Sequence, residues 1–206
     1  MVILESRRSI VLASRSPRRL QLAEAEGWLV RVVAPPEAAE TDAAPRGCDE
    51  SLKEYVQRLA GAKAEAVAAL GTTGTILSCD TLGEVDGRTL GKPTDQKEAR
   101  SMLLSLSGKR HRVLTGVCLW QCPELDPLFS CMESELSMDR LSEDFIDWYL
   151  ASDLWQGKAG ACGFQDERLP LKLVAGSPSN VVGLPLEAIR TLLATVTGQL
   201  RARSAR

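Results

Sequence analysis

Short apolar runs alternate with helical repeats of apolar positions along the first third of the chain. The run at residues 9–14 is typical of a buried strand, and residues 28–35 predict a second strand. Residues 17–27 predict a helix, because Ser16 is a natural N-cap, a proline is tolerated in the first turn and a glycine commonly ends a helix. At residues 51–70 apolar side chains recur three or four positions apart, which predicts a further helix.

The rest of the chain continues the mixture of strands and helices. We find no internal repeat, low-complexity tract or linker, so residues 1–206 are expected to form one domain. The pattern predicts an α/β protein with an elongated mixed sheet and helices on both faces. The expected elements are a strand at 75–79, a turn at Asp86-Gly87, a helix at 95–108, antiparallel strands at 111–122 and 128–138, a helix at 142–152 capped by Ser142, and a strand, polar turn and C-terminal helix at 172–196.

Composition narrows the class of protein. Hydrophobic residues make up 44% of the 206 positions and charged residues 25%, which is ordinary for a soluble globular protein. The formal net charge of −2 argues against a surface that coats nucleic acid, which would be strongly basic. An anion site would therefore need a local concentration of positive charge.

The six cysteines form no CxxC pair, and the chain has one histidine, so a zinc site is not expected. Reduced thiols fit better, as in a cytosolic protein. The N-terminus lacks the apolar core of a signal peptide, and no run reaches the roughly 18 apolar residues of a membrane helix. We expect a cytoplasmic protein that contacts neither membrane nor nucleic acid.

Three arginines gather where the first strand is expected to pass into the first helix. The stretch "SRSPRR" places Ser14, Arg18 and Arg19 at the start of that helix. Backbone N–H groups at a helix start and guanidinium groups both favour phosphate oxygens, so this stretch is a candidate anion site. A solvated basic helix start is the alternative, although arginine is unfavourable beside the positive end of a helix. Arg15 is interpreted as a residue outside the site.

Other charged residues each allow an ordinary interpretation. Asp80 follows a strand and fits either a turn cap or a metal ligand and general base. Lys63 is expected to be a surface lysine on its helix, Lys92 a loop lysine and Glu40 a solvated acid. His111, the single histidine, is expected to be structural.

Six segments of the sequence, taken together, indicate a family that no single residue does. The chain resembles the Maf family of nucleoside triphosphate pyrophosphatases over residues 10–193, nearly its whole length. The segments that carry the resemblance are, in order, "LASRSPRR", "LAGAKAEAV", "SCDTLGEVDGRTLGKP", "LSGKRHRVLTGV", "KAGACGFQ" and "NVVGLPLEAI".

The resemblance implies a fold, an activity and a site. The fold would be similar to inosine-triphosphate pyrophosphatase, with two lobes and a nucleotide cleft. The activity would be hydrolysis of a nucleoside triphosphate to the monophosphate and pyrophosphate with a divalent metal (Mg²⁺, Mn²⁺ or Co²⁺), and a homodimer is plausible. Residue by residue, it implies phosphate binding by Ser14, Arg18, Arg19, Lys63 and Lys92, a general base at Asp80, metal ligands at Glu40 and Asp80, and base or sugar contacts at Gln165 and Thr81.

Three places resemble the dTTP/UTP-hydrolysing branch of the family: "SPRR" without a tryptophan, Thr81, and the segment ending at Gln165. The chain departs from the family at Cys162, where a tyrosine is usual, and at Asp166, where a glycine is usual. An extra residue in "APPEAAE" leaves Glu37 as an alternative to Glu40. The alternatives are a pyrophosphatase for 7-methyl-GTP or another modified purine, and a regulator of cell division that binds nucleotide without hydrolysing it.

Overall fold

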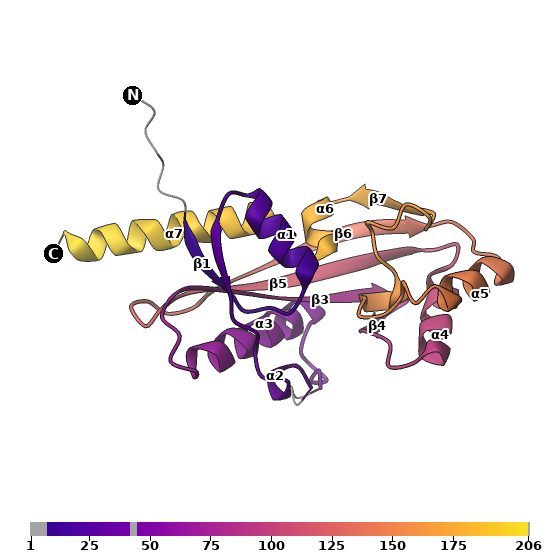
Figure 1. Ribbon diagram of the computed structural model, residues 1–206, viewed down its shortest axis with the longest axis horizontal. Helices are drawn as coiled ribbons and strands as arrows, with labels where there is room; N and C mark the ends of the chain where they lie inside the picture. The colour runs from indigo at the N-terminus through magenta and orange to yellow at the C-terminus, as the bar shows by residue number, and fades with distance from the viewer. Residues whose placement is uncertain (1–7, 42–44, 206) are drawn as a thin grey trace, which may run out of the picture. The chain divides into compact units, whose positions relative to one another are not determined.

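The computed structural model describes residues 8–41 and 45–205, and the chain within it divides into two compact units (Figure 1). The first unit takes in Met1–Asp80, Gly116–Cys131 and Leu186–Arg206. The second takes in Thr81–Thr115 and Met132–Pro185. Each unit is therefore built from segments that are distant in the sequence.

The elements follow the alternation that the sequence predicts. In chain order they are β1 (Ser9–Leu12), α1 (Pro17–Ala25), β2 (Leu29–Val32), α2 (Ala38–Thr41), α3 (Leu52–Ala68), β3 (Gly74–Val85), β4 (Arg88–Leu90), α4 (Gln96–Leu106), β5 (Arg110–Cys122), β6 (Leu128–Met138), α5 (Glu143–Ala151), the 3₁₀ turn η1 (Ala159–Ala161), β7 (Leu171–Ala175), α6 (Pro178–Val182) and α7 (Leu186–Ser204).

The seven strands form one mixed sheet in the order β2-β1-β3-β5-β6-β7, with β4 paired to β3. β1 runs parallel to both β2 and β3, whereas the β3–β4 and β6–β7 pairs are antiparallel. The five residues between β5 and β6 are too few for a parallel crossover, so these neighbours are antiparallel as well. The predicted α/β class with a mixed sheet is confirmed.

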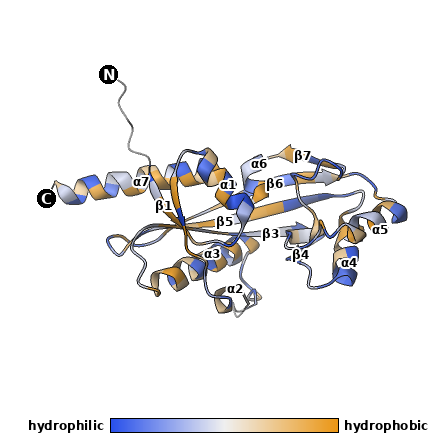
Figure 2. Ribbon diagram, viewed as in Figure 1, coloured by the Kyte–Doolittle hydropathy of each residue, from blue (hydrophilic) through white to orange (hydrophobic). Residues whose placement is uncertain are grey.

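The core of the first unit lies between its strands and α3. Val11 and Ala13 of the β1 segment pack in one buried cluster with Ala60, Ala64 and Val67 of α3. Within this unit, α3 covers one side of the strands, and α1 and α7 lie on the other side (Figure 1). The helices show alternating hydrophobic and polar stripes, as in α7, which is the pattern expected of helices that cover a sheet (Figure 2).

The second unit has a core of its own, formed by α4, α5 and the strands beside them. Leu103 and Leu106 of α4 pack with Ile146 and Tyr149 of α5, all at most 1% exposed. Asn180 is fully buried, and its Nδ2 donates to the Val113 carbonyl (3.2 Å) and to Ser134 Oγ (2.8 Å). These contacts give Asn180 a structural role in the second unit.

Three elements differ from the sequence-based expectation. β3 does not end at Cys79 but continues to Val85, because the Asp86-Gly87 turn reverses the chain into β4 and provides its pairing partner. The expected polar turn after β7 contains the short helix α6, where Ser177 caps the first turn and Pro178 occupies N1. The proline-bearing loop after β2 contains the four-residue helix α2.

Within residues 8–41 and 45–205, each helix is too short or too polar to cross a bilayer.

Gly116 sets the distance between β5 and α3. A Cβ at this position would lie 2.3 Å from the Val56 carbonyl oxygen, which belongs to the helix backbone and cannot rotate away. We expect Gly116→Ala to lower the free energy of unfolding by about 1–3 kcal/mol or more, measured by urea denaturation.

Gly198→Ala is the matched control, because Gly198 lies on α7 with open space where the Cβ would be placed. Alanine has the higher helix propensity, so this variant should be neutral or more stable by about 0.5–1 kcal/mol. Equal stability of the two variants would show that the close approach at Gly116 is not a constraint.

Candidate functional site

The strand-to-helix junction of the first unit is built as the sequence predicts. Ser16 is the N-cap of α1, and its Oγ accepts from the backbone N–H of Arg19 at 3.4 Å. Ser14 is 5% exposed, and its Oγ accepts from the backbone N–H of Ser16 at 3.1 Å. These contacts fix the course of the chain into the helix, so that the positive end of α1 lies at Ser14–Pro17.

Arg19 ties this junction to β3. Its Nη1 donates to the Cys79 carbonyl at 2.8 Å and lies 3.4 Å from Ser14 Oγ. Arg18 beside it is half-buried. The structure therefore brings Ser14 and Arg19 next to the residue that precedes Asp80. The sequence alone could not show this proximity, because sixty positions separate Arg19 from Cys79.

Lys63 and Asp80 form an ion pair of 2.6 Å between Nζ and Oδ1, and their side chains are 9% and 14% exposed. Two ordinary interpretations from the sequence are therefore wrong. Lys63 is not a surface lysine, since it points from α3 onto β3 among the buried Ala60 and Ala64. Asp80 does not cap a turn, since it lies inside β3.

A second contact holds the ion pair in place. Ser78 Oγ donates to the Ala60 carbonyl at 2.6 Å, which joins β3 to α3 one turn before Lys63 and two residues before Asp80. Between these positions, burial raises the pKa of the Cys79 thiol to about 11, so it stays protonated at neutral pH. The Cys79 thiol therefore carries no charge beside the Lys63–Asp80 pair.

The predicted residues of the second unit show three different surroundings. Thr81 Oγ1 lies 3.0 Å from Thr115 Oγ1, and Thr115 in turn donates to the Asn180 carbonyl at 2.9 Å. Lys92 is exposed in the segment after β4, and Gln165 is exposed in a turn after η1. Their roles stay predictions that follow from the family resemblance.

The turn that carries Gln165 is fixed by Asp166, one of the departures from the family pattern. The Asp166 backbone N–H donates to the Gly163 carbonyl at 2.9 Å, and Arg168 Nε donates to Asp166 Oδ1 at 2.9 Å. The guanidinium of Arg168 lies 5.4 Å from the centre of the Trp148 ring. The sequence did not predict the Asp166–Arg168 ion pair, although opposite charges two positions apart in a turn can reach each other.

Burial affects two further side chains that the sequence singles out. Burial raises the pKa of the Cys162 thiol to about 12, so Cys162 contributes neither a charge nor a nucleophile at neutral pH. His111 is 4% exposed, and burial lowers its pKa, which keeps the ring neutral at pH 7. Both side chains fit structural roles.

The acidic segment after β2 lies in the first unit. Glu40 is a residue of helix α2, and its side chain is outside the part of the chain that the structure describes. Arg15, which the sequence analysis leaves out of the site, donates from Nη2 to the Pro35 carbonyl at 2.9 Å. In the described ranges, histidine, cysteine, aspartate and glutamate side chains do not gather in groups of three or more that could hold a metal.

Fold and site together define a mixed α/β protein with a cationic strand-to-helix junction beside a nearly buried lysine–aspartate pair. Residues 9–196 match the family model described as Maf-like protein. The chain therefore belongs to the Maf family, which confirms the resemblance seen in the sequence.

Curated relatives match over nearly the whole chain. A protein of Rhodopirellula baltica named dTTP/UTP pyrophosphatase is 41% identical over 186 residues, which cover 90% of this chain and 81% of that protein. A protein of Dictyoglomus thermophilum with the same name is 36% identical, covering 91% and 95%. Among solved structures, a HAM1 protein from Coxiella burnetii is 17% identical with a TM-score of 0.46, covering 91% of this chain and 99% of that one.

The ion pair gives a stability test in the protein without substrate. Lys63→Met leaves the Asp80 carboxylate largely buried without its cation, so we expect the free energy of unfolding to fall by about 3 kcal/mol. The double variant Lys63→Met, Asp80→Asn should be more stable than the sum of the single changes predicts, with a coupling energy of about 1–3 kcal/mol by urea denaturation.

The pair of Lys109 Nζ and Asp86 Oδ2 provides the matched control, at the same 2.6 Å but with side chains 44% and 64% exposed. Water screens this pair, so its coupling energy should stay below about 1 kcal/mol. Coupling energies of the same size in both pairs would contradict the inference that burial makes the Lys63–Asp80 pair special.

Proposed function

We propose that this Maf-family chain hydrolyses dTTP and UTP to the nucleoside monophosphate and pyrophosphate. The observation that carries the proposal is the 2.6 Å ion pair between Lys63 of α3 and Asp80 of β3. The residue before Asp80 on the same strand, Cys79, accepts a hydrogen bond from Arg19 through its carbonyl. The family match over residues 9–196 and the relatives named dTTP/UTP pyrophosphatase support the substrate class.

The phosphate groups would lie against the start of α1. There the backbone N–H groups, the hydroxyl of Ser14 and the guanidinium groups of Arg18 and Arg19 favour a polyanion. A triphosphate carries about four negative charges, so it would compete with the single charge of Asp80 for Lys63. The family resemblance adds Lys92 as a further phosphate ligand.

Asp80 would act as the general base. A water molecule attacks the α-phosphorus, the bond from that phosphorus to its bridging oxygen breaks, and the electron pair leaves with pyrophosphate. The proton of the water passes to Asp80. Once Lys63 contacts the phosphates instead of Asp80, the carboxylate is free to accept this proton, while the cations balance the charge on the leaving group.

The donor chemistry fits a divalent metal ion. Mg²⁺ prefers oxygen ligands and is commonly bound by one or two carboxylates together with substrate phosphates, so it does not require a cluster of three acids. Asp80 and Glu40 would hold the ion, which would be Mg²⁺, Mn²⁺ or Co²⁺. When bound, it would supply charge neutralisation at the phosphate oxygens.

Recognition of the base would fall to Gln165 and Thr81. The turn at Gln165 is held by the pair of Asp166 and Arg168, so its backbone course is well defined. The departures from the family pattern around Cys162 motivate the second candidate, a pyrophosphatase for 7-methyl-GTP or another modified purine.

A panel of nucleotides with identification of the products tests the proposal. With Mg²⁺ or Mn²⁺, dTTP and UTP should give the monophosphate and pyrophosphate, resolved by ion-exchange chromatography. Release of orthophosphate and a nucleoside diphosphate would contradict the reaction. Faster turnover of 7-methyl-GTP would favour the second candidate, and bound nucleotide without product would favour a binding protein.

Asp80→Asn tests the general base. The amide keeps the size of the side chain but cannot accept the proton, so we expect kcat for dTTP to fall about 10²–10⁴-fold while nucleotide binding is retained. Asp86→Asn, which removes another lysine-paired carboxylate, should leave kcat unchanged because Asp86 lies in the exposed β3–β4 turn. Normal turnover by Asp80→Asn would exclude Asp80 as the base.

A further inference from the structure

Helix α1, which begins at the candidate phosphate site, has little packing of its own. Of its nine residues, all of which the structure describes, one is buried, Ala23. Helices this short are marginal without tertiary contacts, so the contacts at the two ends of α1 decide its position. At the N-terminal end, Arg19 Nη1 donates to the Cys79 carbonyl on β3 at 2.8 Å.

The C-terminal end of α1 is held by a residue that is distant in the sequence. Arg190 of α7 donates to both carboxylate oxygens of Glu26, from Nε at 3.0 Å and from Nη2 at 2.7 Å. Glu26 is the C-cap of α1, where a negative charge is unfavourable beside the negative end of the helix. The two-pronged contact with Arg190 offsets this cost and fixes direction as well as distance.

Helix α7 has the packing that α1 lacks. Its buried side chains are Ala188, Ile189, Leu193 and Val196. Arg8, next to β1, also donates from Nη1 to the Leu193 carbonyl at 3.3 Å. Within the first unit, α1 and α7 lie on the same side of the strands (Figure 1). Because burial holds α7 against the sheet, the pair of Arg190 and Glu26 can set the position of α1.

The Arg190–Glu26 pair is too exposed to matter much for the stability of the fold. The Arg190 side chain is 56% exposed, and exposed ion pairs contribute little because water screens them. Positioning is more demanding, since a displacement of about 1 Å that arises far from the reacting atoms can cost about 100-fold in catalytic efficiency. A contact with a small effect on unfolding can therefore have a large effect on a ligand of α1.

We propose that Arg190 and Glu26 are positioning residues of the phosphate site. They hold α1 so that Ser14 and Arg19 lie beside Asp80, where the phosphate groups would bind. The inference rests on the proposed function for the role of α1. Nine helical residues span about 14 Å, so Glu26 acts through the helix and not by contact with the phosphates.

Alanine at either position tests the proposal, because the two residues carry opposite charges. Arg190→Ala removes a positive charge, which by itself weakens the attraction for an anion, whereas Glu26→Ala removes a negative charge, which by itself strengthens it. Loss of the position of α1 weakens binding in both variants. We therefore expect both to raise KM for dTTP about 10-fold. Lys63 and Asp80 stay paired on α3 and β3, so kcat should change by less than about 2-fold.

Two further variants separate position from charge. Arg190→Lys keeps the positive charge but loses the two-pronged contact, so its KM should lie between those of the wild type and Arg190→Ala. The double variant Glu26→Arg, Arg190→Glu restores a two-pronged contact with the partners exchanged. It should recover most of the lost affinity, although each single change alone should not.

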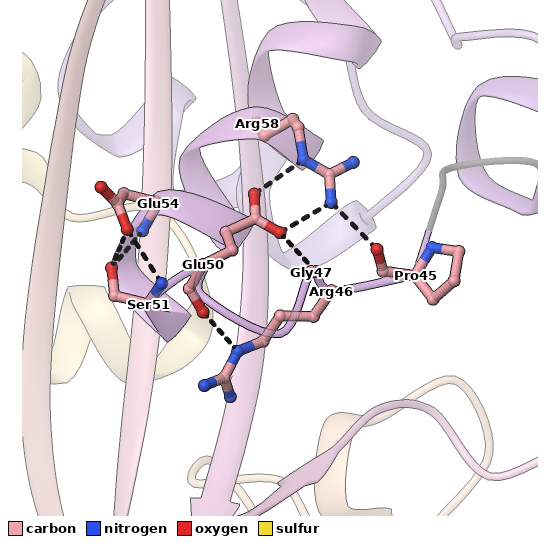
Figure 3. Close-up of polar contacts among 7 residues, drawn as sticks. All are labelled: Pro45, Arg46, Gly47, Glu50, Ser51, Glu54 and Arg58. Atoms are coloured by element: carbon pink, nitrogen blue, oxygen red, sulfur yellow. Dashed lines mark hydrogen bonds and ion pairs between the residues drawn. The ribbon is translucent and has the colours of Figure 1, made fainter.

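The pair of Arg58 and Glu50 is the matched control (Figure 3). Arg58 donates to Glu50 from Nε at 2.8 Å and from Nη2 at 2.9 Å, and the Glu50 side chain is 19% exposed, as is that of Glu26. This pair fixes the turn before α3, a helix that buries seven of its own residues. Arg58→Ala and Glu50→Ala should therefore keep the wild-type KM. Arg201→Ala, in the exposed last turn of α7, controls for the loss of one positive charge from that helix.

Binding of pyrophosphate, measured by isothermal titration calorimetry with Mg²⁺, gives a readout that does not depend on turnover. Kd should rise about 10-fold in Arg190→Ala and in Glu26→Ala, whereas Tm should fall by less than about 4 °C. Unchanged or tighter binding by Glu26→Ala would overturn the inference. An equal loss in Arg58→Ala, or wild-type protein that does not bind pyrophosphate, would overturn it as well. Failure of the proposed function is a separate result, seen as wild-type protein that binds pyrophosphate but releases none from dTTP or UTP.

Discussion

The account depends on one interaction, the ion pair that Lys63 of α3 makes with Asp80 of β3. The pair is largely withdrawn from water, so each charge is tolerated only because the other is present. Removing one charge of the pair is costly because it leaves the other buried and unpaired. Replacing one partner by another group of the same sign avoids that cost. In the proposed function a polyphosphate would offer Lys63 such an exchange, so that a site that is stable when empty would become reactive.

The surrounding structure serves to keep this pair in a fixed place. Gly116 allows α3 to approach β5, and Ser78 joins β3 to the Ala60 carbonyl of the same helix. Arg19 brings the start of α1 to the carbonyl beside Asp80. Core packing, a close backbone approach and side-chain hydrogen bonds thus fix the positions of Lys63 and Asp80, on which the proposed chemistry depends.

Much of the fold could be predicted from local patterns. Short apolar runs, apolar residues that recur three or four positions apart, Ser16 before Pro17, and the Asp86-Gly87 turn are short-range signals, and the elements they predict are confirmed. The continuation of β3 beyond Asp80 was missed, because a strand that bears polar residues gives no apolar signal and depends on its partner β4. Helix α6 was missed because five residues are too few to show a period.

The site was predicted as a set of residues but not as a set of contacts. Family resemblance singled out Lys63 and Asp80, yet their individual sequence contexts favoured a surface lysine and a turn cap, since burial of a charge is a tertiary property. The hydrogen bond from Arg15 to the Pro35 carbonyl could not be predicted either, because Pro35 lies twenty positions away.

A crystal structure of the complex with α,β-methylene-UTP and Mg²⁺ would test the central claim most directly. The account predicts that Lys63 Nζ leaves Asp80 and lies within hydrogen-bond distance of a phosphate oxygen, with Ser14 and Arg19 contacting the same phosphates. A nucleotide bound with the 2.6 Å Lys63–Asp80 pair still intact would contradict it.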